Sequence, residues 1–178
     1  MKIVPLITLL LLSNPNVFSQ KIIVNGEEST GKISWSDFTG KVDKNSSYFA
    51  FTSYKFKTKV GTIKFIGDSV VISSFDVILE LDNKNSWAKK DKITDELLVH
   101  EQGHFNIGIL CVKEIMANYK KAKFTKSNYS TLLQSIVSDA SKKYKEMGLK
   151  YDRETNHSKN KEEQEKWNTY FKENLSNN

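Results

Sequence analysis

The spacing of apolar residues changes near residue 94, and this change restricts the folds that the chain can adopt. In residues 54–60 and 75–82 apolar and polar side chains largely alternate, which predicts half-buried β-strands. Residues 94–123, 127–148 and 160–175 instead carry apolar residues at helical spacing. We therefore expect an α+β fold, with a small antiparallel sheet in the N-terminal half and three helices in the C-terminal half.

Two residues are suited to mark the ends of these helices. Thr94 precedes an acidic pair, and its hydroxyl can accept a backbone N–H bond as an N-cap. Gly148 closes the second helical run, and glycine favours the left-handed backbone that ends many helices. The second helix is therefore expected to stop at Gly148.

The first nineteen residues have the pattern of a secretory signal peptide. A lysine is followed by a mostly apolar run at residues 3–12, and Val17 and Ser19 suit the positions three and one before a cleavage site. An apolar run of about ten residues is too short to span a bilayer. We expect residues 1–19 to be removed and residues 20–178 to form one secreted or periplasmic domain with no stable membrane anchor.

Charge and cysteine content narrow the class of protein further. The formal net charge is +6, but Arg153 is the only arginine, whereas surfaces that recognise nucleic acid usually rely on arginine forks. We therefore do not expect a nucleic-acid partner. Cys111 is the only cysteine, so the chain forms no internal disulfide, and we expect this residue to be a small buried part of the core.

The stretch ELLVHEQGHF, residues 96–105, contains two of the three histidines. His100 and His104 are four residues apart, so on a helix their imidazoles lie one turn apart on the same face. The pattern H-E-x-x-H is typical of a catalytic zinc site, in which Glu101 is the general base. The alternative interpretation is a pair of ordinary polar helix residues beside a solvated glutamate.

A catalytic zinc usually has three protein ligands, so the helical pair needs a partner. His157 is the remaining histidine, and an antiparallel helical hairpin brings the segment after Gly148 back to the level of His104. Asp152 and Glu154 are alternatives, either as ligands or as hydrogen-bond acceptors that orient a ligating imidazole.

Two further residues near the predicted site have competing interpretations. Tyr151 is either a packing residue, which we favour, or a phenol that stabilises an oxyanion. Glu114 lies off the face that carries the histidines, so we expect it to be a solvated helix residue.

Three segments together resemble a known family. ISWSDFTGK (33–41), HEQGHFNI (100–107) and YDRETNHSKNKEEQEKW (151–167) occur in this order and are similar to a bacterial family of predicted secreted zinc-dependent proteases, domain of unknown function 922. The resemblance implies that His100, His104 and His157 bind Zn²⁺ and that Glu101 is catalytic. It does not extend to metalloproteases with a third histidine six residues after the second, because Leu110 stands there.

The sequence thus predicts a single zinc-dependent protease-like domain acting on a peptide or protein substrate. An edge strand near the motif helix is expected to hold an extended peptide, although the sequence does not identify that strand. The alternative is a secreted metal- or cell-envelope-binding protein that cleaves nothing and has a structural or vestigial zinc site. Glu101 distinguishes the protease from the binding protein, because a structural zinc site needs no general base.

Overall fold

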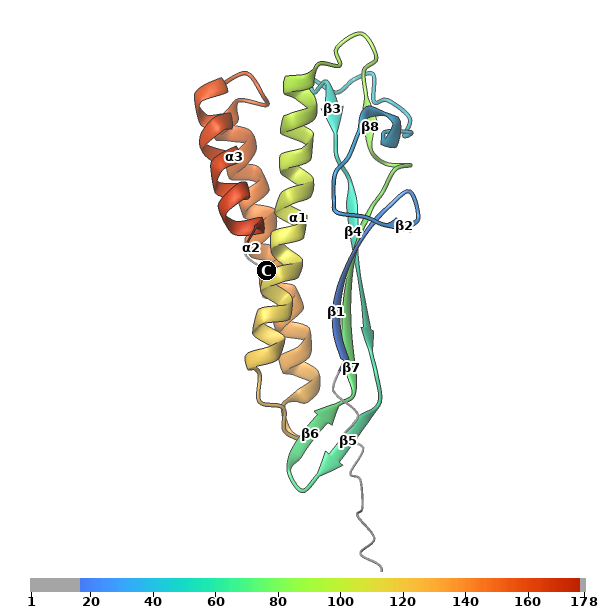
Figure 1. Cartoon of the computed structure of the whole chain (residues 1–178), viewed down its shortest axis with the longest axis vertical. Helices are drawn as coiled ribbons and strands as arrows, with labels where there is room; N and C mark the ends of the chain where they lie inside the picture. The colour runs from blue at the N-terminus through green and yellow to red at the C-terminus, as the bar shows by residue number, and fades with distance from the viewer. Residues whose placement is uncertain (1–16, 177–178) are drawn as a thin grey trace, which may run out of the picture.

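The computed structural model describes residues 17–176, which form a sheet covered on one side by helices (Figure 1). The strands of this part of the chain are β1 (Val17–Val24), β2 (Glu27–Glu28), β3 (Ala50–Phe51), β4 (Tyr54–Val60), β5 (Ile63–Ile66), β6 (Ser69–Ile72), β7 (Ser74–Leu81) and β8 (Trp87–Ala88). The helices are α1 (Asp95–Lys121), α2 (Tyr129–Thr155) and α3 (Lys161–Leu175), and a single 3-10 turn spans Trp35–Asp37. The predicted α+β class is confirmed.

The main sheet is mixed, which corrects the prediction of an antiparallel one. Its strand order is β2-β1-β7-β4, and β4 pairs with β7 antiparallel, from Tyr54 opposite Leu81 to Val60 opposite Phe75. However, β1 runs parallel to β7. A parallel pair needs a long connection, and residues 25–73, which form β2 to β6, provide it between β1 and β7. The strands β3 and β8, and β5 and β6, form separate two-stranded sheets.

The predicted signal peptide overlaps the first strand. Residues 1–16 lie outside the described residues, but Val17–Ser19 belong to β1 and pair with Ser74–Asp76. The Ser19 hydroxyl donates a hydrogen bond to Asp76 Oδ1 at 2.8 Å. Cleavage after Ser19 would remove Val17–Ser19 from β1 and leave Gln20–Val24. The cleavage site itself stays a prediction.

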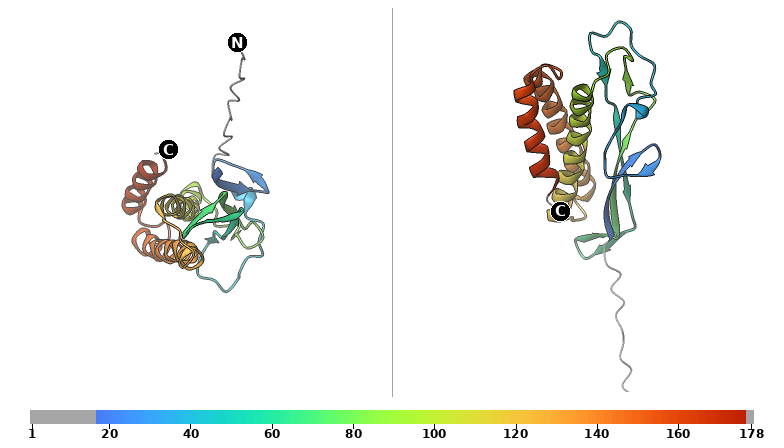
Figure 2. Two further views of the ribbon diagram at one scale, coloured as in Figure 1. Left: turned by 90° about the horizontal axis from the view of Figure 1, so that it is seen from below. Right: turned by 45° about the horizontal axis from the view of Figure 1, so that its top comes forward.

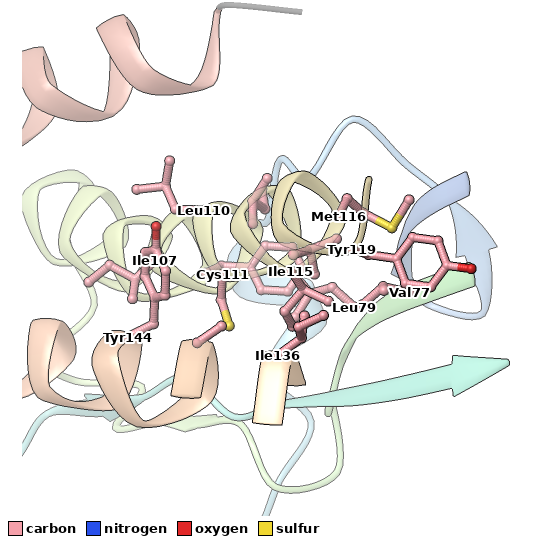
Figure 3. Close-up of a cluster of buried hydrophobic side chains, with 14 of the residues drawn as sticks. Val77, Leu79, Ile107, Leu110, Cys111, Ile115, Met116, Tyr119, Ile136 and Tyr144 are labelled. Atoms are coloured by element: carbon pink, nitrogen blue, oxygen red, sulfur yellow. The ribbon is translucent and has the colours of Figure 1, made fainter. Parts of the chain in front are cut away.

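The core lies between the sheet and α1. Along β7 every second residue is buried, as the alternating pattern predicted, and burial of each such aliphatic side chain contributes about 2 kcal/mol. Helix α1 packs on β1 and β7 with one face and on α2 and α3 with the other (Figures 1 and 2). Cys111 is fully buried within this core, as expected (Figure 3). No helix among residues 17–176 is long and apolar enough to cross a membrane.

The helix start predicted at Thr94 is confirmed, whereas the end predicted at Gly148 is wrong. The Thr94 hydroxyl accepts a bond from Leu97 N at 3.1 Å. Helix α2 continues through Gly148 to Thr155. A glycine inside a helix costs about 1 kcal/mol, and the burial of Tyr151 and Thr155 in the following turns offsets this cost.

Helix α2 ends in an unusual turn. Asn156, His157 and Ser158 all have positive φ angles, of 46°, 50° and 75°, a region that non-glycine residues seldom adopt. The His157 N–H donates to the Asp152 carbonyl at 3.1 Å, and the Asn160 N–H donates to the Thr155 carbonyl at 2.8 Å. These bonds hold His157 close to the last turn of α2.

Candidate metal centre

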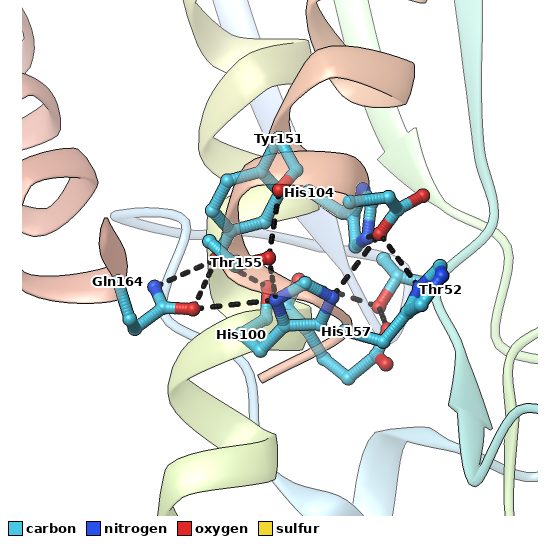
Figure 4. A network of polar contacts seen from close by, with 9 residues as sticks. Thr52, His100, His104, Tyr151, Thr155, His157 and Gln164 are labelled. Atoms are coloured by element: carbon cyan, nitrogen blue, oxygen red, sulfur yellow. Dashed lines mark hydrogen bonds and ion pairs between the residues drawn. The ribbon is translucent and has the colours of Figure 1, made fainter. Parts of the chain in front are cut away.

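Side chains from α1, from α2 and from the turn after α2 meet in one polar network (Figure 4). Helix α1 presents His100, Glu101 and His104 in its first half, and α2 brings Asp152 opposite them. His157 approaches from the turn, where its ring lies 4.8 Å from that of Tyr48. The hairpin geometry inferred from the sequence therefore does return His157 to the level of the motif.

One carboxylate oxygen stands at the centre of the three imidazoles. Asp152 Oδ1 lies 2.9 Å from His104 Nε2, 3.2 Å from His100 Nε2 and 3.4 Å from His157 Nδ1. From the sequence, Asp152 was either an alternative ligand to His157 or an acceptor that orients a ligating imidazole. In the structure both residues lie at the site.

A chain of hydrogen bonds fixes the orientation of His100. The Glu165 carboxylate accepts from Asn168 Nδ2 at 3.2 Å, so Asn168 Oδ1 is free to accept from Gln164 Nε2 at 3.0 Å. Gln164 Oε1 then faces His100 Nδ1 at 3.3 Å and accepts its proton. In this tautomer His100 Nε2 has a lone pair that is directed toward Asp152.

A lone pair that faces a carboxylate oxygen is unfavourable unless a proton or a metal ion lies beside them. Ligand atoms of His100, Asp152 and His157 all lie within 4.8 Å of one another, so this group could hold a metal ion. Although burial opposes ionisation of Asp152, the hydrogen bond from His104 and the charge of His104 hold its pKa below the usual range. Burial likewise favours neutral His104, but its bond to Asp152 and the charge of Glu101 raise its pKa. Ionised Asp152 therefore provides electrostatic attraction for a cation at this site.

Glu101 is buried beside this group, with 3% of its surface exposed. Its Oε2 accepts a hydrogen bond of 2.6 Å from the Thr52 hydroxyl, which comes from the segment between β3 and β4. Within residues 17–176, Glu101 forms no ion pair with a histidine, lysine or arginine. The Thr52 contact thus fixes the orientation of the Glu101 carboxylate beside the imidazoles.

The site opens into a cleft of about 450 Å³. One wall consists of residues 47–52, and the others carry the three histidines, Glu101 and Asp152 together with Leu97, Leu149 and Lys159. Several apolar side chains at the cleft are exposed by 40 to 55%, namely Tyr48, Phe49, Phe51 and Leu149. Exposed apolar groups around a polar centre are typical of a binding site.

Tyr151 packs against His100, which confirms the packing interpretation. Its ring is fully buried and stacks on His100, with 4.7 Å between the centroids. Its hydroxyl donates to the His100 carbonyl at 3.1 Å and accepts from Gln164 Nε2 at 2.8 Å. Gly103 makes this approach possible, because a Cβ atom there would lie 2.2 Å from the Tyr151 hydroxyl oxygen.

The other acidic candidates lie away from the centre. Glu154 accepts a hydrogen bond from Trp167 Nε1 at 2.9 Å on the far side of α2. Glu114 was expected to be a solvated helix residue, and this prediction is wrong. It pairs with Lys143 and accepts a bond of 3.0 Å from the Tyr144 hydroxyl, because α2 packs beside α1.

Sequence reasoning did not find Thr52, Gln164 or Gly103. Thr52 and Gln164 act through contacts 49 and 64 residues away, which no local pattern reveals. Gly103 carried a signal, because a glycine in the interior of a helix often marks a close approach of two elements.

Comparison with known proteins places the chain in a family without assigning an activity. Neither a curated protein nor a solved structure matches the chain significantly. The model of one family, described as bacterial protein of unknown function, matches residues 26–158. This range includes all the candidate ligands and Glu101, but the description names no protease. The chain therefore belongs to the DUF922 family of bacterial proteins of unknown function.

Proposed function

We propose that the protein is an exported zinc-dependent peptidase, with His100, His104 and His157 as zinc ligands and Glu101 as general base. Buried Glu101, held by Thr52 next to the converging imidazoles, is the observation that supports this proposal best. Three imidazole nitrogens and a carboxylate oxygen are ligands that Zn²⁺ accepts, and the donor set therefore fits this metal. Asp152 adds a negative charge on the same side.

Zinc would polarise a peptide carbonyl and lower the pKa of water to about 7. Glu101 accepts the proton of the attacking water and later donates it to the leaving amine. The Thr52 hydroxyl holds Oε2 of Glu101, which orients the carboxylate toward the cleft. Gln164 keeps His100 in the tautomer that directs Nε2 to the site, and the stacked ring of Tyr151 holds the imidazole in place.

Strand β3 is suited to hold an extended substrate. The Lys89 N–H donates to the Phe49 carbonyl at 2.8 Å, on the β8 side. Because backbone groups alternate in an antiparallel pair, the N–H and C=O of Ala50 point away from β8, and Ala50 lines the cleft. A peptide that pairs there would place its side chains against Phe49 and Phe51, so we propose a preference for apolar residues near the cleaved bond.

The second candidate function is that of a binding protein with a closed zinc site. The position of Asp152 favours it, because three imidazoles and one carboxylate would fill all four positions of a tetrahedral zinc. In that case the cleft would bind material without cleaving it.

Metal analysis combined with a peptide-library cleavage assay tests the proposal. The protein should contain one zinc per chain and cleave peptides with apolar residues near the cleaved bond, and removal of zinc by a chelator should abolish cleavage until zinc is restored. A full zinc content without cleavage of any library peptide would favour the closed site. Absence of bound zinc, even after addition of the metal, would contradict both candidate functions.

A further inference from the structure

The net positive charge of the chain is concentrated at the end of the molecule opposite the candidate metal centre. Residues 59–72 and 117–130, which we call the hairpin end, contain six lysines and one acidic residue, Asp68. The lysines are Lys59, Lys64, Lys120, Lys121, Lys123 and Lys126. These segments thus contribute +5 of the formal net charge of +6, and the remaining residues together are almost neutral.

The two segments of the hairpin end lie side by side. The β5–β6 hairpin turns at Gly67, whose φ of 58° suits a tight turn. Val70 N–H donates to the Phe124 carbonyl and Lys126 N–H to the Asp68 carbonyl, each at 2.9 Å. These bonds attach the hairpin to the connection between α1 and α2 (Figures 1 and 2). The six lysines therefore lie at the same end of the molecule.

The hairpin end combines unpaired cations with an apolar tip. All six lysines are exposed, and within residues 17–176 none of them forms an ion pair. Phe65 and Ile66 at the tip of the hairpin are exposed by 53% and 65%, and nearby Val60 by 41%. Exposed apolar groups surrounded by lysines match the chemistry of a bilayer interface, where the apolar groups enter the headgroup region and the cations contact lipid phosphates.

The path of the chain supports the same partner. Val17, the first described residue, donates its N–H to the Ser73 carbonyl at 3.2 Å, directly after β6. The preceding residues, which carry the predicted export signal, thus join the described chain at the hairpin end. Until the predicted cleavage after Ser19, that signal would hold this end of the domain near the membrane.

We propose that the hairpin end binds reversibly to an anionic bilayer surface, with Phe65 and Ile66 in the headgroup region. His104 is 17 residues from the end of α1 at Lys121, or about 25 Å along the helix axis. The cleft therefore stays in water while the protein is attached. The inference does not depend on the proposed peptidase activity.

Sedimentation of the full chain with lipid vesicles tests this inference, with phosphatidylcholine vesicles compared against vesicles that also contain phosphatidylglycerol. The measured quantity is the gain in binding that phosphatidylglycerol produces, which separates the hairpin end from any contribution of the apolar run at residues 3–12. This gain should decrease as salt is added. Lys123→Gln with Lys126→Gln should reduce it roughly 30-fold, at about fivefold for each lysine. Ile66→Ser should weaken vesicle binding roughly tenfold.

The matched control is Lys142→Gln with Lys145→Gln, which removes the same charge from the exposed face of α2. It should leave vesicle binding unchanged. An equal loss in this control, equal binding to neutral and anionic vesicles, or retention of binding in the Lys123 and Lys126 variant would overturn the inference. Displacement of the vesicles by a short DNA duplex at similar concentration would also overturn it, in favour of nucleic acid. The lysine variants change only exposed side chains, so circular dichroism should confirm an unchanged fold.

Discussion

At the scale of single residues, the main question at the candidate metal centre is which of His157 and Asp152 binds the metal ion. The two side chains contact each other, with 3.4 Å between His157 Nδ1 and Asp152 Oδ1. Asp152 also contacts the imidazoles of His100 and His104 on α1. His157 also sits in a left-handed backbone conformation, which a non-glycine residue adopts at a cost of about 1 to 3 kcal/mol. Such strain is typical of a residue held for its function.

We predict that His157→Ala removes most of the zinc affinity, whereas Asp152→Ala weakens it about 10- to 100-fold. The reason is that His157 supplies a ligand nitrogen, while Asp152 mainly adds charge and orients the imidazoles. Isothermal titration of the metal-free variants with zinc measures both values. Normal zinc binding by the His157 variant together with loss of binding in the Asp152 variant would transfer the ligand role to Asp152.

A second prediction concerns Gln164, which reaches the site from α3. Replacement by leucine removes the acceptor of the His100 Nδ1 proton and leaves the buried Tyr151 hydroxyl without the Gln164 donor. We expect zinc affinity to fall about 10- to 100-fold, and Gln164→Glu, which restores an acceptor, to recover part of it. If glutamate and leucine variants bind zinc equally weakly, Gln164 acts through packing alone.

At the scale of secondary-structure elements, the site depends on the close approach of α1 and α2. Gly103→Ala would place a methyl group against the Tyr151 hydroxyl, and overpacking of this kind typically costs 1 to 3 kcal/mol. We predict a lower free energy of unfolding by about that amount and weaker zinc binding, because Asp152 moves with Tyr151. Urea unfolding and zinc titration measure the two effects.

Gly148→Ala is the matched control for this prediction. A Cβ atom at Gly148 meets nothing within 4 Å, and alanine favours a helix more than glycine does. This variant should be more stable by about 0.5 to 1 kcal/mol with unchanged zinc binding. A Gly103 variant that is as stable as the control would show that α1 and α2 do not require this contact.

The elements themselves were largely predictable, because strand alternation and helical spacing are local properties of the sequence. The Thr94 cap and the lengths of α1 and α3 followed from such signals. The end of α2 did not, because packing of Tyr151 and Thr155 outweighs the local preference of Gly148. The parallel pairing of β1 with β7 was also missed, since it joins residues 57 positions apart.

At the scale of the whole molecule, the two ends have separate chemistry. The cleft with its histidines lies at the end where β3 and the turn after α2 meet, and the lysine-rich surface lies at the hairpin end. The motif histidines were predictable from their spacing. The orienting contacts of Thr52 and Gln164 were not, because they depend on how the whole fold closes around α1.

Cys111 offers a probe of the stability of the whole molecule. Its thiol is fully buried, and burial raises its pKa to about 12. An unfolded thiol loses its proton near pH 8.5, whereas the native thiol keeps it, so above that pH the thiol favours unfolding. We predict that a thiol reagent labels the native protein only through global unfolding, and faster as pH rises above about 8.5. Rapid labelling at pH 8 without denaturant would contradict this burial.

The most direct test of the peptidase proposal is the comparison of Glu101→Gln with the unchanged protein at equal zinc content. The amide has nearly the same size and can still accept from Thr52, but it cannot take a proton from water. We predict one zinc per chain in both proteins and a loss of peptide cleavage of at least about 10²-fold in the variant, whereas Glu114→Gln on the same helix should retain full cleavage. Undiminished cleavage by the zinc-loaded Glu101→Gln protein would contradict the proposed role of Glu101.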